Sequence, residues 1–157
     1  MEELRSCFSA LGFEDVRTYI QSGNVLFRGA DVDETAIEEA LAEQFGYPGR
    51  VVVMSHRRYA QALAAAPPAW GHGSDRRHNA LFTLRGTRPG AVMGMLPPLS
   101  EFEEVGLAPG VIFWSGAKDR LTRTVFVSRL GSHPVYQELT VRNHNTVFRL
   151  ATMLEEM

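Results

Sequence analysis

Residues 16–28 read Val16-Arg17-Thr18-Tyr19-Ile20-Gln21-Ser22-Gly23-Asn24-Val25-Leu26-Phe27-Arg28. β-Branched and aromatic side chains are frequent in both halves of this stretch, and Ser22-Gly23 separates them. Two β-prone runs joined by a short turn with glycine are typical of a β-hairpin. The sequence therefore predicts paired strands over 16–21 and 24–28.

Helices are predicted on both sides of this hairpin. The apolar positions of the first helix, at i, i+3, i+4 and i+7, are Leu4, Cys7, Phe8 and Leu11. Gly12 is the residue type that commonly follows the last turn of a helix. Asp33 is suited to cap a second helix that Gly46 ends, and acidic residues crowd its first turns, where the helix dipole favours them. We next expect a buried strand over 51–54 and a short helix capped by Ser55.

The second half of the chain has a similar pattern. Its predicted elements are a strand at 78–84, a short helix at 89–97, strands at 102–106 and 110–115, a segment of uncertain type at 122–131, and a final helix capped by Asn143 or Asn145. Such a succession indicates two copies of a split β-α-β unit. The predicted fold class is α+β, with two ferredoxin-like split βαβ lobes, antiparallel sheets and a first lobe that lacks its opening strand. We place the first lobe at 1–66, a linker at 67–77 and the second lobe at 78–157.

The absent opening strand has a physical consequence. In a β-α-β-β-α-β lobe the first strand is central, so its absence leaves neighbouring strand edges without partners. Either the chain is truncated before Met1, or another segment fills the gap. We favour truncation, because a sheet with an open central position leaves backbone groups unpaired.

Composition and charge narrow the class of protein. The 157 residues are 45% apolar and 22% charged, which predicts one compact domain or two small lobes around a packed core. A single cysteine, the absence of a long apolar run and the acidic start predict a cytoplasmic protein without a signal peptide or membrane span. Residues 1–45 carry ten acidic groups and three arginines, whereas 118–149 carry six basic and two acidic groups. Polyanion binding is therefore considered only for local basic clusters.

The polar residues before the last helix form the main candidate site. The candidates are Lys118, Arg120, Arg123, Arg142, Asn143, Asn145 and Thr146. Free amides at a helix N-terminus, the helix dipole and an arginine together suit an anion. The alternative is that the asparagines and Thr146 cap the helix while Arg142 pairs with an acid. At the hairpin tip, Gln21, Ser22 and Asn24 are further ligand-binding candidates, for which turn chemistry is the alternative.

Signatures of familiar active sites are missing. The sequence contains no phosphate loop, no nucleophile elbow, no His-Glu-x-x-His and no dinucleotide-binding glycine pattern. His72, Asp75 and His78 have a spacing that metal ligands can use, but the run is rich in glycine and shows no second shell, so no metal site is predicted. The sequence identifies no cofactor.

Two motifs resemble a known bacterial family, the domain-of-unknown-function family 1697. They are residues 16–25, quoted above, and residues 136–146, which contain Thr140-Val141-Arg142-Asn143. The resemblance implies two ferredoxin-like lobes, an intracellular bacterial protein and no established reaction. Family members carry a further N-terminal strand with a glycine-rich loop and a tryptophan where this chain has His144.

Four functional hypotheses follow. The leading one is a protein that binds a small anionic or nucleotide-like ligand between the hairpin tip and the segment 142–146. The second is an RNA- or DNA-binding module, although Phe82 lies on one strand face with Ala80 and Leu84, which favours burial. The third is a phosphate-ester transferase or hydrolase with His144 as acid or base. The fourth is a structural or partner-binding protein, and the oligomeric state is not predicted.

Overall fold

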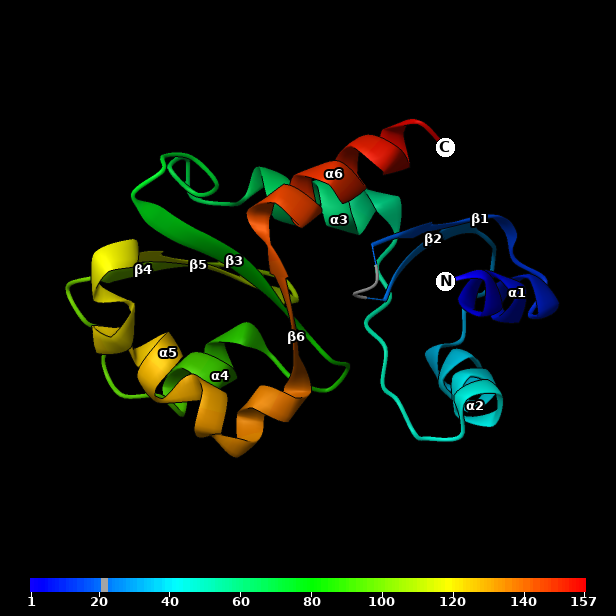
Figure 1. The fold of residues 1–157 in the computed structure, drawn as a ribbon, viewed down its shortest axis with the longest axis horizontal. Helices are drawn as coiled ribbons and strands as arrows, with labels where there is room; N and C mark the ends of the chain where they lie inside the picture. The colour runs from blue at the N-terminus through cyan, green and yellow to red at the C-terminus, as the bar shows by residue number, and fades with distance from the viewer. Residues whose placement is uncertain (21–22) are drawn as a thin grey trace. The chain divides into compact units, whose positions relative to one another are not determined.

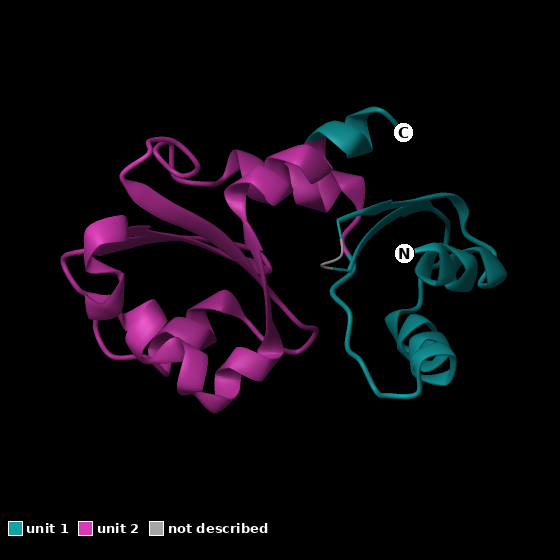
Figure 2. Cartoon of the chain, in the orientation of Figure 1, with its two compact units in different colours: residues 1–53, 152–157 teal, residues 54–151 magenta. Residues whose placement is uncertain are grey.

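The fold is α+β with two antiparallel sheets, as predicted. The computed structural model describes residues 1–20 and 23–157 (Figure 1). The chain divides into two compact units, residues 1–53 with 152–157 and residues 54–151 (Figure 2). This division lies between Val53 and Met54, ahead of the stretch 67–77 that was predicted to join the two lobes. Across the described ranges, no helix combines the length and the apolar character that a membrane span requires.

The first unit packs two helices against the predicted hairpin. Its elements are α1 (Glu2–Ala10), β1 (Glu14–Tyr19), β2 (Asn24–Arg28) and α2 (Glu34–Phe45). The strands pair antiparallel, and both helices end as predicted, with Gly12 and Gly46 in the left-handed region. Asp33 caps α2 by accepting the amide of Thr35 at 2.9 Å. Phe8 and Ile37 are buried in this unit, and the ring of Phe8 packs against that of Phe27 in the hairpin, with centroids 5.3 Å apart.

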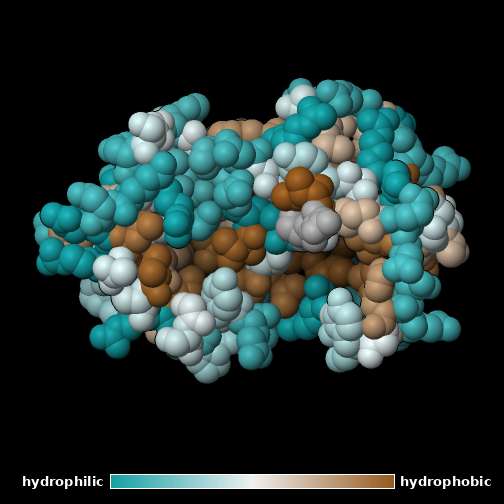
Figure 3. Space-filling view, viewed as in Figure 1, coloured by the Kyte–Doolittle hydropathy of each residue, from teal (hydrophilic) through white to brown (hydrophobic). Residues whose placement is uncertain are grey.

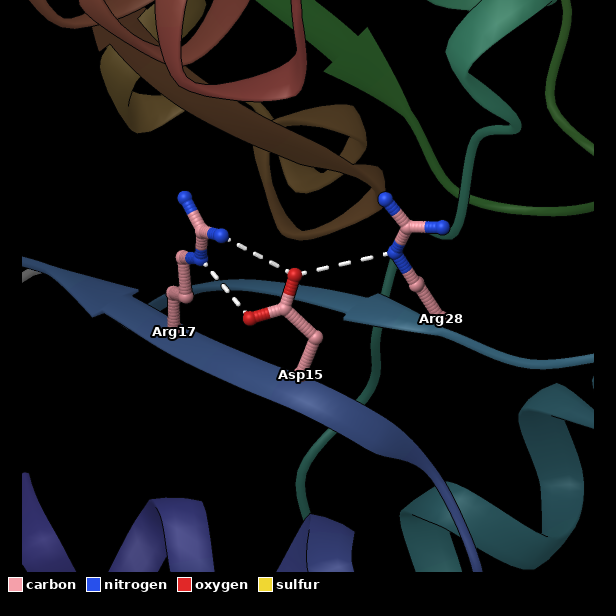
Figure 4. Close-up of polar contacts among 3 residues, drawn as sticks. All are labelled: Asp15, Arg17 and Arg28. Atoms are coloured by element: carbon pink, nitrogen blue, oxygen red, sulfur yellow. Dashed lines mark hydrogen bonds and ion pairs between the residues drawn. The ribbon is translucent and has the colours of Figure 1, made fainter. Parts of the chain in front are cut away.

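A β-bulge interrupts the hairpin at Asp15. Glu14 lies opposite Arg28, and the next paired residue, Arg17, lies opposite Leu26, so two residues of β1 lie opposite one residue of β2. Asp15 has a φ of 46°, and its carboxylate lies between two guanidinium groups (Figure 4). Arg17 Nε lies 2.9 Å from one carboxylate oxygen, and Arg28 Nε lies 3.6 Å from the other. The hydrogen bonds from Arg17 lower the pKa of Asp15 below its usual value.

The strand predicted over Val51–Met54 is wrong, because this segment has no strand partner. The last strand of a split β-α-β lobe normally pairs with the first strand. Among the described residues, the sheet of the first unit holds only β1 and β2. The amides of Val51 and Val53 instead donate to the carboxylates of Glu38 and Glu34 on α2, at 3.0 and 3.2 Å. Side chains thus satisfy amides that a neighbouring strand would otherwise bind.

The second unit contains a four-stranded antiparallel sheet. Its strands are β3 (Arg76–Thr83), β4 (Glu103–Ala108), β5 (Val111–Ala117) and β6 (Leu139–Asn143). Its helices are α3 (His56–Ala64), α4 (Pro89–Gly94), α5 (Val125–Ser128), the start of α6 (His144–Glu155), and the short 3₁₀ helices η1 (Lys118–Arg123), η2 (Leu130–Ser132) and η3 (Pro134–Glu138). The strand order β4-β5-β3-β6 places the first strand of the unit in the interior and the last at an edge, as in a ferredoxin-like lobe.

Helices cover both faces of this sheet (Figure 1). On one face, Tyr59 of α3 stacks on Phe82, with ring centroids 6.1 Å apart, and donates its hydroxyl to the carbonyl of Val147 in α6. On the other face, Leu81, Ile112 and Trp114 pack with residues of α4, α5, η2 and η3. Figure 3 shows hydrophobic side chains gathered between the sheet and this second helical layer. The burial expected for Ala80, Phe82 and Leu84 is therefore confirmed.

The stretch 67–77 contributes to the core of the second unit. Trp70 is 3% exposed, and its ring contacts Phe113 with centroids 4.9 Å apart. Its indole Nε1 donates to the carbonyls of Asn79 and Trp114, at 3.2 and 3.1 Å. Trp70 thus holds the loop that follows α3 against strands β3 and β5.

Candidate functional site

One end of the four-stranded sheet brings several predicted site residues together. At this sheet end, β3 begins at Arg76, β5 ends at Ala117 and β6 ends at Asn143. Arg76 lies opposite Ala117, and Asn79 lies opposite Asn143. Lys118, which follows β5, donates its amide to the carbonyl of Asp75 at 3.0 Å. The segments 142–146 and 118–123 therefore leave the same end of the sheet.

The start of α6 is capped by Asn143. The side-chain oxygen of Asn143 accepts the amide of Thr146 at 2.9 Å. Thr146 is buried, whereas Asn143 and Asn145 are exposed. Capping uses one of the free amides of the helix and leaves the exposed amide group of Asn145 beside the terminus.

Arg142 is oriented along its own strand. Its Nη1 donates to the hydroxyl of Thr140 at 3.1 Å and to the carbonyl of Val141 at 2.8 Å. Burial lowers the pKa of Arg142, but an arginine in a protein keeps its charge at every ordinary pH. Arg142 lies opposite Ala80 and so on the sheet face that α3 and α6 cover.

The basic residues of η1 are exposed and differ in their partners. Arg120 donates to the carbonyl of Asp119 and also lies 3.4 Å from its carboxylate. The guanidinium carbon of Arg123 lies 4.8 Å from the ring centre of Phe102, a cation–π geometry. Lys118 is exposed at the sheet end. Of the three predicted cations of η1, Lys118 is thus the one next to the ends of β3 and β5.

The hairpin-tip candidates belong to the first unit. Gln21 and Ser22 lie outside the described residues. Asn24 is buried, and its side-chain nitrogen donates to the carbonyl of Tyr19 at 3.1 Å, which is turn chemistry within the hairpin. Asn24 and the segment 142–146 belong to different units, and each is described within its own unit.

The structure adds a cluster of buried nitrogen atoms that sequence reasoning did not assemble. Arg76 Nε, His78 Nδ1 and His144 Nδ1 are buried without a hydrogen-bond partner within the described parts of the chain. His78 and His144 meet edge to face, with ring centroids 5.3 Å apart. Arg76 and His78 are two residues apart on β3, so they share the sheet face beneath α6. We call these three atoms the nitrogen cluster.

Backbone and aromatic groups hold the nitrogen cluster in place. His78 is 1% exposed, and its Nε2 lies 2.8 Å from the carbonyl oxygen of His72. Arg76 Nη2 donates to the backbone carbonyl of Ser115 at 3.1 Å. The ring of Trp70 contacts His78 and His144, with centroids 6.3 and 6.4 Å away. The cluster therefore combines two imidazole groups with a guanidinium that the carbonyl of Ser115 holds in place.

Burial and the neighbouring basic groups favour the neutral form of His78. Desolvation by burial lowers its pKa below the ordinary value, and the positive potential of His144, Arg76 and His72 acts in the same direction. The hydrogen bond to the carbonyl of His72 opposes this shift but does not cancel it. A neutral imidazole has one donor and one acceptor nitrogen, so His78 offers hydrogen-bonding capacity without adding a buried charge.

The nitrogen cluster does not have the arrangement of side chains that binds a metal ion. Within residues 1–20 and 23–157, no three His, Cys, Asp or Glu side chains converge as metal ligands do. In the sequence, the spacing of His72 and His78 was the pattern that pointed to this part of the fold. It could not reveal the third member, His144, because that residue arrives from a helix sixty-six positions further along the chain.

Comparisons with known proteins agree with the fold. A family model described as "Protein of unknown function (DUF1697)" matches residues 1–113. The solved structure of conserved bacterial protein SP0830 from Streptococcus pneumoniae superposes with a TM-score of 0.86 at 26% sequence identity. The match covers 99% of this chain and 88% of that one. No curated protein matches the chain.

Proposed function

The chain belongs to the DUF1697 family of proteins of unknown function, and from that starting point we propose that its second unit binds a small phosphate-bearing anion at the sheet end. The observation that carries this proposal is the nitrogen cluster. Buried polar atoms are nearly always hydrogen-bonded, and each unsatisfied one costs about 1–3 kcal/mol. Three of them at one place indicate that a polar group completes the site.

Positive charge around the sheet end favours an anion. Arg76 and Arg77 begin β3, and Lys118 follows β5. Asp75 and Asp119 are the acids next to them in sequence, so the local balance remains positive. An arginine donor beside a helix N-terminus is a common arrangement for a phosphate or carboxylate.

The predicted ligand residues have different roles in this proposal. Asn143 fixes the start of α6, and Asn145 and Lys118 present exposed donors to the ligand. Arg142 contributes charge from β6 while it remains bonded to Thr140. Arg120 and Arg123 attract the anion from solution, and Thr146 donates its buried amide to the cap. Asn24, Gln21 and Ser22 remain ligand-binding candidates in the first unit.

The direct test is a calorimetric titration with inorganic phosphate, ribose 5-phosphate and adenosine monophosphate. Lys118→Ala removes an exposed cation from the sheet end, and a loss of about threefold in affinity is expected from a solvent-exposed charge. Arg129→Ala is the matched control, because Arg129 is an exposed arginine at the end of α5, outside the proposed site. Equal affinities in wild type and Lys118→Ala, with no salt dependence, would contradict an electrostatic anion site.

Turnover of a phosphate ester is a second candidate function. The unpartnered Nδ1 of His144 is the observation that favours it, because a general acid or base needs a nitrogen free to exchange a proton. p-Nitrophenyl phosphate is a simple probe. Release of nitrophenol by the wild type and not by His144→Phe would support catalysis, whereas equal rates in both would exclude His144 as the acid or base.

A nucleic-acid platform is not favoured by the sheet of the second unit. Binding of single strands on a ferredoxin-like sheet uses aromatic rings exposed on one face. Phe82 and Phe113 are 7% and 2% exposed, and helices cover both faces of their sheet.

A further inference from the structure

The protonation pattern of the nitrogen cluster specifies the kind of anion that fits it. His78 Nε2 faces a backbone carbonyl oxygen, which can only accept a hydrogen bond. Nε2 must therefore carry the proton. In the neutral ring this leaves Nδ1 as an acceptor with no hydrogen of its own.

The second member of the cluster has the opposite character. Arg76 Nε is always protonated and can only donate. Its direction is fixed because Nη2 of the same group donates to the carbonyl and lies 3.4 Å from the hydroxyl of Ser115. A buried acceptor on His78 thus lies two residues from a buried donor on the same face of β3.

The third member, His144, can act as a donor or as an acceptor at Nδ1. Its Nδ1 is buried and unpartnered, and a neutral imidazole can place the proton on either nitrogen. The groups that face His78 are Arg76, His144 and His72, all of them basic. A second positive charge on His78 is therefore disfavoured, so the acceptor on its Nδ1 persists at neutral pH.

A ligand for this arrangement must offer a bare oxygen and an O–H group together. Resting on the proposed function, we infer that the nitrogen cluster selects a phosphate group that keeps an O–H over sulfate: the O–H donates to His78 Nδ1 while an unprotonated oxygen accepts from Arg76 Nε. Sulfate has the same shape but carries no proton near neutral pH. The monoanion and the dianion of inorganic phosphate both keep an O–H, so phosphate can satisfy His78 and sulfate cannot.

The loop that follows Trp70 lies beside the nitrogen cluster. His72 is exposed, and its backbone carbonyl is the group that anchors His78. Gly71 and Gly73 both have a φ of 85°, and the ring of His72 lies 6.3 Å from that of Phe148.

The test compares inorganic phosphate with sulfate by calorimetry at pH 6 and pH 8. Phosphate is expected to bind at least about tenfold more tightly than sulfate at pH 6, since an unsatisfied buried acceptor costs about 1–3 kcal/mol. This preference is expected to persist at pH 8, because the phosphate dianion that predominates there still carries one O–H. In His78→Phe the two anions are expected to bind alike, whereas the exposed control His56→Gln retains the preference for phosphate.

A measurement on the wild type keeps the inference testable if His78→Phe does not fold. The ¹⁵N resonance of His78 Nδ1 is expected to move when phosphate is added and to stay in place when sulfate is added. Equal binding of the two anions at pH 6, or an Nδ1 resonance that phosphate leaves unchanged because water alone occupies the cluster, would overturn the selectivity while leaving anion binding intact. If neither anion binds the wild type, the proposed function fails together with the inference.

Discussion

The indole Nε1 of Trp114 donates to Oε1 of Glu103 at 3.1 Å, within the core of the second unit. The same carboxylate accepts the amides of Val125 and Phe126 and both the amide and the hydroxyl of Ser100. Glu103 is 5% exposed. One buried carboxylate therefore joins strand β4, strand β5 and the first turn of α5 through five donors.

Replacement of this acceptor is expected to destabilise the second unit. In Glu103→Gln, the new NH₂ group faces donors in place of an acceptor, so at least two donors lose their partner. A loss of about 2–4 kcal/mol in the free energy of unfolding is expected, measured by urea denaturation. Glu104→Gln makes the same chemical change at an exposed neighbour and is expected to stay within about 0.5 kcal/mol of wild type.

Glu103 also predicts a loss of stability in acid. Burial alone would raise its pKa, but the donors, led by the amide of Val125, outweigh burial and hold the pKa below the ordinary value. The unfolded chain then takes up a proton at a higher pH than the folded protein does. The wild type is expected to lose stability as the pH falls below about 4.3. A smaller loss over this range in Glu103→Gln would confirm the assignment, and an unchanged profile would contradict it.

Removal of the Tyr59 hydroxyl is expected to cause a second, smaller loss of stability. It donates to the carbonyl of Val147 at 2.8 Å and joins α3 to α6. Tyr59→Phe keeps the ring that stacks on Phe82 and removes only this hydrogen bond, so a loss of about 1 kcal/mol is expected. Tyr136, whose side chain is 42% exposed, provides the control Tyr136→Phe. Equal stability of the two variants in thermal unfolding would show that the bond between the helices is unimportant.

Local signals predicted most of the elements, whereas the failures depend on distant partners. Asp33, Gly46 and Ser55 act within one turn of their own helix, and all three behave as their residue types predict. Val51–Met54 has the composition of a strand, but a strand exists only where another strand supplies its hydrogen bonds. No local pattern reports whether that partner is present.

The candidate site also contains one part that the sequence predicted and one part that it did not. Asn143 was predicted either as a cap or as a ligand residue, and its bond to Thr146 establishes the cap. The nitrogen cluster could not be predicted, because it depends on a backbone carbonyl at His72 and on the position of α6 over β3. The unpaired state of a buried atom follows from three-dimensional packing and has no sequence pattern.

Replacement of Gly71 is expected to lower stability through close packing, an effect that can be separated from backbone strain. A Cβ at this position would lie 2.5 Å from the ring of Phe148, and Gly71 has a φ of 85°. Gly86 has the same φ, and nothing lies within 4 Å of its Cβ position. Gly86→Ala is therefore expected to cost about 1 kcal/mol from strain alone, and Gly71→Ala clearly more. The extra loss should shrink when Phe148→Leu is combined with Gly71→Ala, whereas equal losses at both glycines would argue against close packing on Phe148.

His78 predicts that stability decreases between neutral and mildly acidic pH. Its folded pKa lies below the ordinary value, chiefly because burial disfavours the imidazolium. The unfolded chain, with a histidine pKa near 6.5, therefore binds a proton at a pH where the folded protein does not. This contribution to stability is present above about pH 6.5 and decreases as the pH falls toward the folded pKa.

The measurement is urea unfolding at pH 7.5 and pH 5.5 for wild type, His78→Gln and His56→Gln. His56 is exposed at the start of α3, so its replacement should leave the pH dependence unchanged. His78→Gln should be less stable at pH 7.5 but should lose less on acidification than the wild type. If all three proteins lose the same free energy between the two pH values, the proton is not excluded at His78. The neutral acceptor that the nitrogen cluster requires would then be absent, so this result also bears directly on the selectivity for phosphate over sulfate.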